Sequence, residues 1–400
     1  MENKLLLSLV DKHRNLAISA REHLHRNPEL SNQEFKTSTY IQAFLKEAGI
    51  EHYVVPGMTG VVGIIRGAEE GKTVALRADM DALPLSENSS KPYRSQNDGV
   101  MHACGHDVHT AILLGTARVL QDAREHLRGN VKLFFQPAEE TTGGAKRMVA
   151  AGCMKDPDVD WVYGLHVDAA IPCGTLRTKA GAFNASSDTF EVTIHGNKAH
   201  GADPHLGNDA IVAAASIIME LQTVVSRRVS PHDSVVITVG KMSGGTVRNV
   251  ISDMATLSIM VRTTSSEARK RATEAVDAII EHACAMHGVT VDVDAYHGYD
   301  SMNNSEACVE VIRSVAERVL GKEAFGYVEH PFLGCEDFCY FCTDIPGAFY
   351  QLGSRNESLG ITAPTHSSEY DADPETIPTG MKMQAGIVFE LIGAEDVKPK

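Results

Sequence analysis

The chain has 400 residues, of which 43% are hydrophobic and 22% charged, with 33 glycines and 15 prolines. This is the composition of an ordinary globular protein, and it excludes the disordered and fibrous classes. The formal net charge of -15 at pH 7 argues against binding to nucleic acid or to an anionic membrane surface, because both require a basic protein surface. We therefore expect a small-molecule or peptide partner.

Apolar runs and cysteines indicate the compartment. No apolar run approaches the roughly 20 residues of a membrane helix, and the apolar stretch near the N-terminus is too short for a signal peptide. The eight cysteines are too sparse for a disulfide-dense secreted domain. The sequence therefore predicts reduced thiols, no membrane span and a cytoplasmic location.

The first part of the chain alternates between helical and strand-like segments. Residues 1–50 have helical spacing, interrupted at Asn27-Pro28. Short apolar stretches typical of strands follow, with a helical segment at residues 110–122 among them. The strand-like stretches are residues 61–65, 73–79, 131–137 and 159–166. This alternation predicts a mainly parallel sheet with helices on its faces.

Residues 186–298 follow a different order, strand–helix–strand–strand–helix–strand. This order is typical of a ferredoxin-like unit. Both of its helices begin after plausible caps, at Asn208 or Asp209 and at Ser265 or Ser266. We therefore expect these residues to fold as a self-contained domain.

After this insertion the chain returns to helix at residues 305–320 and ends in a helix of about residues 379–393. The later residues are thus free to complete the first sheet. We predict an α/β protein with a discontinuous catalytic domain, residues 1–185 and 299–400, and an inserted lid or dimerisation domain, residues 186–298.

Candidate metal ligands gather where the predicted strands end. In α/β sheets, functional groups collect beyond the carboxyl ends of the strands. The richest stretch is MHACGHDVHTA, residues 101–111, which we expect on the loop before the helix at residues 110–122. The other candidates are Asp79, Asp81, Glu139, Glu140, His166 and His366.

Taken singly, these groups have ordinary explanations. Cys104 and His106 suit zinc or a similar metal, but such a pair also occurs by chance. Glu139 and Glu140 could be a solvated acidic pair before a helix, and His166 could be a hydrogen-bonded core histidine. Adjacent residues at a strand end point in opposite directions, so we expect one glutamate to bind metal and the other to handle protons.

Taken together, the candidates predict a two-metal site. Five ligands, one of them shared between two ions, are what a two-metal hydrolase needs. The predicted ligands are Cys104, His106, Glu140, His166 and His366. Zinc, manganese, cobalt and nickel all suit this mixture of thiolate, imidazole and carboxylate.

Six motifs, HACGHDVHTA, FFQPAEE, YGLHV, RADMDALP, RNVISD and THS, span the chain. Together they resemble the aminoacylase and carboxypeptidase metallopeptidase family. The closest resemblance is to its branch of bacterial hippurate and N-acyl-amino-acid amidohydrolases and plant auxin-conjugate hydrolases. With RxHLHxNPEL at residues 21–30, the resemblance covers nearly the whole chain. It implies a metal-bearing α/β domain with an inserted ferredoxin-like lid.

The resemblance also implies individual roles. Cys104 would bridge the two ions, at a position where other branches have aspartate. Glu139 would be the general base, and His200 the lid histidine that polarises the scissile carbonyl, often in the site of a dimer mate. Arg248 and Asn249 would hold the substrate carboxylate. The implied ligand sets are His106 and His166 for one ion, and Glu140 and His366 for the other.

Some residues depart from the family pattern or stay outside the ligand set. Asp79 falls where other branches have a ligand histidine, and we assign neither Asp79 nor Asp81 a ligand role. Asp107 is a candidate partner for a ligand imidazole. Ser252 replaces a usual proline and Cys335 a usual serine, which leaves substrate detail open.

A late cysteine cluster and a thiol active site are weaker alternatives. Cys335, Cys339 and Cys342 have C-x3-C-x2-C spacing, which is similar to the iron–sulfur loop of radical enzymes. No strand-and-glycine pattern that would bind a nucleotide cofactor follows them, which disfavours this alternative. Under the family resemblance they belong to a helical turn beside the active site. No C-x-x-C with a context that would lower the thiol pKa occurs near Cys104, so thiol oxidoreductase chemistry is disfavoured.

These features predict a metal-dependent amidohydrolase that cleaves N-acyl amino acids to a carboxylic acid and a free amino acid. Two divalent ions are the expected cofactors, and a homodimer or higher oligomer through the lid is the expected assembly. One alternative is a metallo-carboxypeptidase or dipeptidase that acts on small peptides. Another is a metal-binding protein without turnover.

Overall fold

The computed structural model describes residues 2–394 and contains two compact units. The first unit comprises Met1–Gly181, Asn303–Glu329 and Tyr340–Lys400, and the second Ala182–Met302 and His330–Cys339. The predicted insertion, residues 186–298, lies within the second unit. Residues 330–339 also belong to that unit, although we expected them in the catalytic domain.

The first unit is built on an eight-stranded sheet with the order β1-β2-β4-β3-β5-β14-β6-β13. Its strands are β1 (Glu51–Val54), β2 (Val61–Arg66), β3 (Glu69–Asp79), β4 (Arg128–Gln136), β5 (Trp161–Pro172), β6 (Leu176–Thr178), β13 (Phe325–Tyr327) and β14 (Gly347–Arg355). The central strands β4, β3, β5 and β14 pair in parallel. The predicted α/β class with a mainly parallel sheet is confirmed.

The central strands are buried on both faces, as their continuous apolar sequences require. In β4, Phe135 joins the main core with residues of the covering helices. Its neighbour Phe134 points to the opposite face and stacks on Phe341, with ring centroids 5.2 Å apart. The strand ends are therefore the places where polar side chains can emerge.

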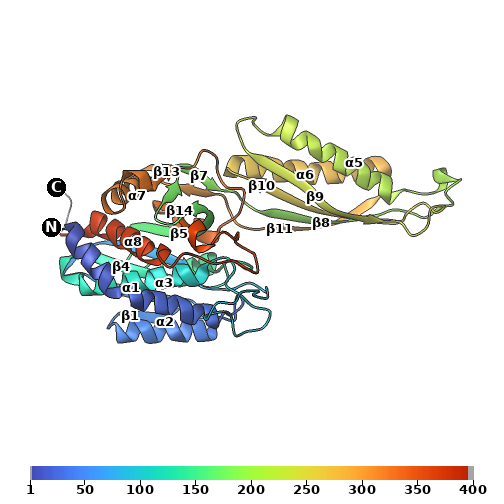
Figure 1. Cartoon of the computed structure of the whole chain (residues 1–400). Helices are drawn as coiled ribbons and strands as arrows, with labels where there is room; N and C mark the ends of the chain where they lie inside the picture. Colours follow the sequence, from blue (N-terminus) through green and yellow to red (C-terminus); the bar gives the residue numbers. More distant parts are fainter. Residues whose placement is uncertain (1, 395–400) are drawn as a thin grey trace. The chain divides into compact units, whose positions relative to one another are not determined.

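Helices complete the first unit (Figure 1). They are α1 (Glu2–Arg26), α2 (Phe35–Glu47), α3 (His106–Asp122), α4 (Gly144–Ala150), α7 (Glu306–Val319) and α8 (Thr376–Ile392), with 3-10 turns η1 (Arg124–His126), η4 (Lys322–Ala324) and η6 (Glu357–Leu359). A further 3-10 turn, η5 (Asp337–Cys342), begins in the part of the chain assigned to the second unit and ends in the first. The break that we predicted at Asn27-Pro28 is confirmed between α1 and α2. Helix α3 begins at His106 rather than near residue 110, so part of the metal-ligand motif is helical.

The second unit has the predicted order β8-α5-β9-β10-α6-β11, and its sheet order is β11-β8-β10-β9. The elements are β8 (Asp188–His195), η2 (Pro204–Leu206), α5 (Ala210–Thr223), the short π-helix η3 (Val224–Arg228), β9 (Val235–Gly244), β10 (Met254–Thr263), α6 (Ser266–His287) and β11 (Thr290–His297). All its strand pairs are antiparallel. The ferredoxin-like prediction is confirmed. The short strands β7 (Gly181–Asn184) and β12 (Met302–Asn304) lie where the chain passes between the units.

Both helices of the second unit begin at residues that we predicted as caps. The Asp209 side chain accepts hydrogen bonds from the backbone of α5, and the Ser265 side chain accepts one from Ala268. These bonds satisfy amide groups that have no partner within the helix. Ala213 and Ile217 of α5, with Ala272 and Val276 of α6, pack in the core of this unit.

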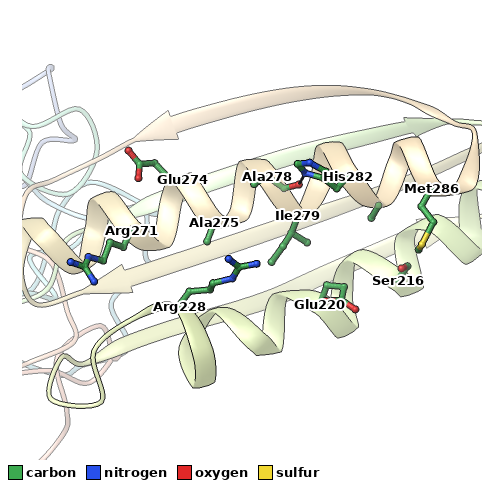
Figure 2. A pocket seen from close by; sticks show the side chains of 11 residues that line it. Ser216, Glu220, Arg228, Arg271, Glu274, Ala275, Ala278, Ile279, His282 and Met286 are labelled. Atoms are coloured by element: carbon green, nitrogen blue, oxygen red, sulfur yellow. Dashed lines mark hydrogen bonds between the residues drawn. The ribbon is translucent and has the colours of Figure 1, made fainter.

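The outer sides of α5 and α6 border a cleft of about 640 Å³ (Figure 2). Ala275, Ala278 and Ile279 line it together with Arg228 and Arg271. By length and composition, the helical stretch Ala210–Arg228 could cross a membrane, whereas we expected no such stretch. Part of its apolar surface is the face that covers the sheet of the second unit and is buried there.

Candidate metal centre

The loop and helix that carry Cys104 and His106 require glycine between them. Gly105 has a φ of 94° and precedes the first residue of α3. A Cβ atom there would lie 2.3 Å from Val167 Cγ2 and 2.7 Å from Tyr370 Oη. Only glycine combines this left-handed backbone with such close packing. The motif C-G-H thus turns its thiol and imidazole toward the carboxyl ends of the strands.

Two ligand candidates depend on residues with left-handed backbone that are not glycine. Ala138, just before the glutamate pair, has a φ of 57°, and His366 has a φ of 63°. Hydrogen bonds hold both: the Ala138 amide donates to Glu34 Oε1 at 2.9 Å, and the His366 amide donates to the Ala103 carbonyl at 2.8 Å. Such conformations persist where the surroundings over-determine them, and they cluster at functional sites.

The donor atoms of the five predicted ligands converge in the first unit. Cys104 Sγ lies 3.3 Å from His166 Nε2 and 3.3 Å from His366 Nε2. Glu140 Oε1 lies 3.8 Å from His106 Nε2 and 3.7 Å from His366 Nε2. Among the five predicted ligands, two sets of three have their donor atoms within 4.8 Å of one another, namely Cys104 with His106 and His166, and Cys104 with Glu140 and His366.

Within residues 2–394, two of these donor atoms are buried without a hydrogen-bond partner, namely His106 Nε2 and Glu140 Oε1. A buried polar atom without a partner is unfavourable unless something satisfies it. Sulfur, imidazole nitrogen and carboxylate oxygen are together the ligands of zinc and similar divalent metals. The residues present therefore fit two cations that share Cys104.

Outer hydrogen bonds leave the Nε2 atoms of two histidines free for metal. His106 Nδ1 lies 3.2 Å from Asp81 Oδ1, and His166 Nδ1 donates to the Val167 carbonyl at 2.7 Å. Asp81 also accepts from Ser31 Oγ at 2.7 Å and from the Glu140 amide at 3.1 Å. Asp81 thus orients His106 through its ring and Glu140 through the Glu140 backbone amide, as residues behind the ligands of metal sites do.

Burial and charge shape the protonation of this site. Burial raises the pKa of the Cys104 thiol well above its ordinary value, although His106 beside it acts to lower it. For His106, burial acts to lower the pKa, but Asp79 and Cys104 raise it well above the ordinary value. A thiolate–metal bond requires loss of the thiol proton, so divalent charge is the natural partner of this cluster.

Glu139 and Glu140 do not diverge as their adjacency in a strand would predict. Strand β4 ends at Gln136, so the alternation of a strand does not extend to them. Their carboxylate oxygens and a ring nitrogen of His106 all lie within 4.8 Å of one another. Glu139 is buried, whereas Glu140 is partly exposed. Both carboxylates therefore face the metal centre, and their division into ligand and base is a proposal.

His166 and Asp107 lie differently from what we expected. His166 is inside β5, which continues to Pro172, and not beyond its end. Within residues 2–394, the partners of the Asp107 side chain are not candidate ligands: its Oδ2 accepts from Arg21 Nε at 2.7 Å and lies 2.8 Å from His25 Nδ1. The aspartate that orients a ligand imidazole is Asp81. The sequence offered a signal for it, since Asp81 follows the end of β3 by two residues.

The Asp107 cluster ties together the segments that surround the site. Arg21, fully buried on α1, pairs with Asp107 of α3 and, at 2.8 Å, with Asp371, which follows His366 by five residues. His25 lies between Asp107 and Glu87, whose Oε2 is 3.3 Å from His25 Nε2. Burial acts to raise the pKa of Glu87, but His25, the Ser89 hydroxyl and the Ser95 amide together lower it to about 2.

The candidate substrate residues all lie in the second unit. His200 pairs with Val250 in an isolated bridge, and the Gly201 amide donates to the Asn249 carbonyl at 2.8 Å. His200, Arg248 and Asn249 therefore lie on two neighbouring segments, and all three are exposed. Their roles toward substrate remain predictions.

Ser252, which replaces the usual proline, has a clear structural role. Its hydroxyl donates to the Met254 carbonyl at 2.7 Å and accepts from the Gly245 amide at 3.1 Å. The late cysteines are free thiols, as are all eight cysteines of the chain. Within residues 2–394, no cluster of candidate metal ligands includes Cys335, Cys339 or Cys342.

Comparisons with known proteins identify the family of this chain. The model of peptidase family M20/M25/M40 matches residues 75–390. N-acetyl-L-cysteine deacetylase of Bacillus subtilis is 40% identical over 356 residues, which cover 89% of this chain and 83% of that protein. Thermostable carboxypeptidase 2 of Saccharolobus solfataricus is 37% identical over 381 residues, which cover 94% of this chain and 95% of that protein.

A solved structure has the same fold throughout. The Bacillus subtilis YXEP protein, described as a dinuclear metal binding peptidase from the M20 family, superposes with a TM-score of 0.82 and 32% identity. The match covers 96% of this chain and 99% of that one. The fold and the site define a metallopeptidase-type α/β protein with an inserted ferredoxin-like domain. The chain belongs to peptidase family M20/M25/M40, so the predicted family is confirmed.

Proposed function

We propose that this protein is a metal-dependent amidohydrolase that cleaves N-acyl amino acids to a carboxylic acid and a free amino acid. The observation that carries the proposal is the convergence of two three-ligand groups on the shared Cys104 thiol. The deacetylase relative supports the acylated amino acid as the substrate class.

Cys104, His106 and His166 would hold one cation, and Cys104, Glu140 and His366 the other. When bound, two divalent cations polarise the amide carbonyl and acidify a water molecule. Glu139 would accept the proton of the attacking water at a carboxylate oxygen and return it to the leaving nitrogen. Its burial near His106 and Glu140 supports this role.

The second unit would supply the contacts that select and polarise the substrate. His200 would donate a hydrogen bond to the carbonyl oxygen as negative charge develops there. Arg248 and Asn249 would bind the free carboxylate of the amino acid, since a guanidinium group recognises carboxylates. A substrate with a free carboxylate next to the scissile amide is therefore expected.

The test is a hydrolysis screen with metal analysis of the same sample. N-acetyl, N-benzoyl and longer N-acyl amino acids are compared with their carboxyl methyl esters and with dipeptides. We expect turnover of the free acids, weaker turnover of the esters, and about two divalent ions per chain. Metal-loaded protein that hydrolyses none of these compounds would contradict the proposal and favour a metal-binding protein without turnover.

A carboxypeptidase is the second candidate, because one relative carries that name. It requires the same metal centre but a site that accepts a peptide on the acyl side. Release of C-terminal amino acids from unacylated peptides faster than from N-acyl amino acids would favour it.

The native metal, assembly and location are part of the proposal. Zinc, manganese, cobalt and nickel all suit the donor set. Eight free thiols support a reducing, cytoplasmic location. We also propose a homodimer or higher oligomer through the second unit, which size-exclusion chromatography with light scattering would test.

A further inference from the structure

The imidazole of His109 lies between two candidate ligand histidines, although the proposed mechanism does not use it. It is fully buried, and its ring centroid lies 5.4 Å from that of His106 and 4.6 Å from that of His166. The Val167 amide donates to His109 Nε2 at 2.9 Å, and His109 Nδ1 lies 2.5 Å from Asp79 Oδ1. Because Nε2 accepts, the ring proton is on Nδ1 and is donated to Asp79. Neither nitrogen is left for a metal ion.

Val167 connects His109 with His166. Pairing between β3 and β5 ends where Arg77 lies opposite Gly164, so the next residues of β5 do not pair with β3. The Val167 amide finds its acceptor in His109, and the Val167 carbonyl accepts from His166 Nδ1 at 2.7 Å. His109 thus fixes the residue whose carbonyl orients the ligand imidazole.

Asp79 is itself held on the other side. Arg77 Nη1 donates to Asp79 Oδ2 at 2.7 Å, and Arg77 Nε donates to Gln136 Oε1 at 2.8 Å. Gln136, the last residue of β4, precedes the glutamate pair. These side chains are fully buried, where hydrogen bonds are strong and an unsatisfied group is costly. A continuous hydrogen-bonded chain therefore runs from β4 through β3 and α3 to β5.

We propose that His109 is a positioning residue. Asp79 accepts the Nδ1 proton of His109 and so selects its tautomer. Through Val167, His109 then directs His166 Nε2 toward the cation that His166 and Cys104 would both bind. The inference rests on the proposed function, because it takes His166 as a ligand. It also gives Asp79 a role behind the ligands, although other branches have a ligand histidine at that position. Both Asp79 oxygens already have partners, Arg77 and His109.

The test measures Co²⁺ binding by chelator-treated full-length protein in a double-mutant cycle. We expect His109→Leu to weaken binding of one of the two ions by about 10- to 100-fold, the usual effect of removing an outer partner of a metal ligand. His166→Ala should weaken the same ion further. The double variant should bind Co²⁺ no more weakly than His166→Ala alone, because His109 acts only through His166.

Two further variants keep the test decisive. Thr110→Val is the matched control: it removes the hydrogen bond from Thr110 Oγ1 to the Asp79 carbonyl, so it should lower the melting temperature and leave Co²⁺ affinity unchanged. His109→Gln should recover part of the lost affinity, because its amide oxygen can reach the Val167 amide. If His109→Leu does not fold, the cycle is run with His109→Gln.

The outcomes separate this inference from the proposed function. Additive losses of His109 and His166, or a folded His109→Leu with wild-type affinity, would overturn the positioning role. Unchanged Co²⁺ binding by His166→Ala would overturn the ligand assignment and the positioning role with it. A non-additive cycle in a protein that hydrolyses no N-acyl amino acid would support the positioning role and refute the proposed function.

Discussion

The candidate ligands of the first unit and the candidate substrate residues of the second unit are held in different ways. The candidate ligands come from distant parts of the chain. Asp81 and the Val167 carbonyl engage the Nδ1 atoms of His106 and His166, and the buried pair of Arg21 and Asp107 ties together segments around the site. His200, Arg248 and Asn249 lie on two exposed, paired segments. The first arrangement fixes geometry before ligands bind, whereas exposed side chains must be ordered by substrate, which costs conformational entropy.

This difference predicts that substitutions in the first unit change metal content or the chemical step, whereas those in the second unit change substrate affinity or oxyanion stabilisation. The expected effects below run from the largest to the smallest.

Cys104→Ala should have the largest effect, because one thiolate serves both proposed cations. We expect loss of metal, measured by elemental analysis after gel filtration, and a fall in kcat greater than the roughly 10- to 100-fold caused by losing an outer partner. Cys104→Asp should restore part of both. Cys284→Ala, which removes a buried thiol of α6, is the control. Full metal occupancy in Cys104→Ala would refute the shared-ligand assignment.

Glu139→Gln should lower kcat by about 100- to 10,000-fold, the range for loss of a general base, while the two metal ions stay bound. Steady-state kinetics and metal analysis on the same sample check this. Glu140→Gln is the matched variant and should lose metal as well. If both variants lose metal equally, our division of the glutamate pair is wrong.

His200→Ala should lower kcat by about 100- to 1,000-fold, as expected for a residue that stabilises the oxyanion. Metal content and the melting temperature should not change, because the side chain is exposed. His205→Ala, an exposed histidine of the same unit, serves as the control. A change in KM alone would assign His200 to substrate binding instead.

Arg248→Ala should raise KM for N-acyl amino acids by about 10- to 100-fold, since a hydrogen bond to a charged group contributes about 1.5 to 3 kcal/mol. The carboxyl methyl ester should be hydrolysed equally by the variant and the wild type. An equal loss of activity on the free acid and on its methyl ester would show that Arg248 does not bind the carboxylate.

Glu87→Gln should affect stability rather than turnover. The pKa of Glu87 is lowered to about 2 in the folded protein, from an ordinary value of 4.5. Its ionised form therefore stabilises the fold above about pH 4.5, and this contribution disappears as the pH falls toward 2. We expect the variant to lose about 1 to 3 kcal/mol of the free energy of unfolding near pH 6, and to lose less at lower pH. Urea unfolding measures both.

Glu47→Gln is the control for Glu87→Gln. It removes an exposed carboxylate that pairs with Arg118, and it should lower the free energy of unfolding by less than about 1 kcal/mol both near pH 6 and at acid pH. An equal, pH-independent loss in both variants would show that the His25–Glu87 contact does not set acid stability.

Periodicity and caps were enough to predict the second unit. Its helices are long, amphipathic and capped at Asp209 and Ser265, and its strands follow one another at short intervals. Local patterns decide such elements because each one is specified by contiguous residues. The start of α3 was harder to place. It depends on the left-handed backbone of Gly105, which packs closely against Val167 and Tyr370, and these two residues are distant in the sequence.

The candidate ligand residues were predictable as chemical types at strand ends, and the structure brings the donor atoms of all five close together. Their outer partners were not. Asp107 is closer in sequence to the ligands than Asp81 is, yet Asp81 lies against His106, while Asp107 pairs with Arg21 and His25. Sequence distance does not report which carboxylate a buried ring meets.

By itself, then, the sequence determined the α/β class and the ferredoxin-like insertion through periodicity, the family through its motifs, and the set of candidate metal ligands through residue chemistry. Only the tertiary structure decided that both glutamates face the centre, that His166 lies within β5, and that His109 and Asp81 stand behind the ligands. The physical reason is that a buried polar atom must find a partner, and the packing of segments far apart in the chain determines which partner is within reach.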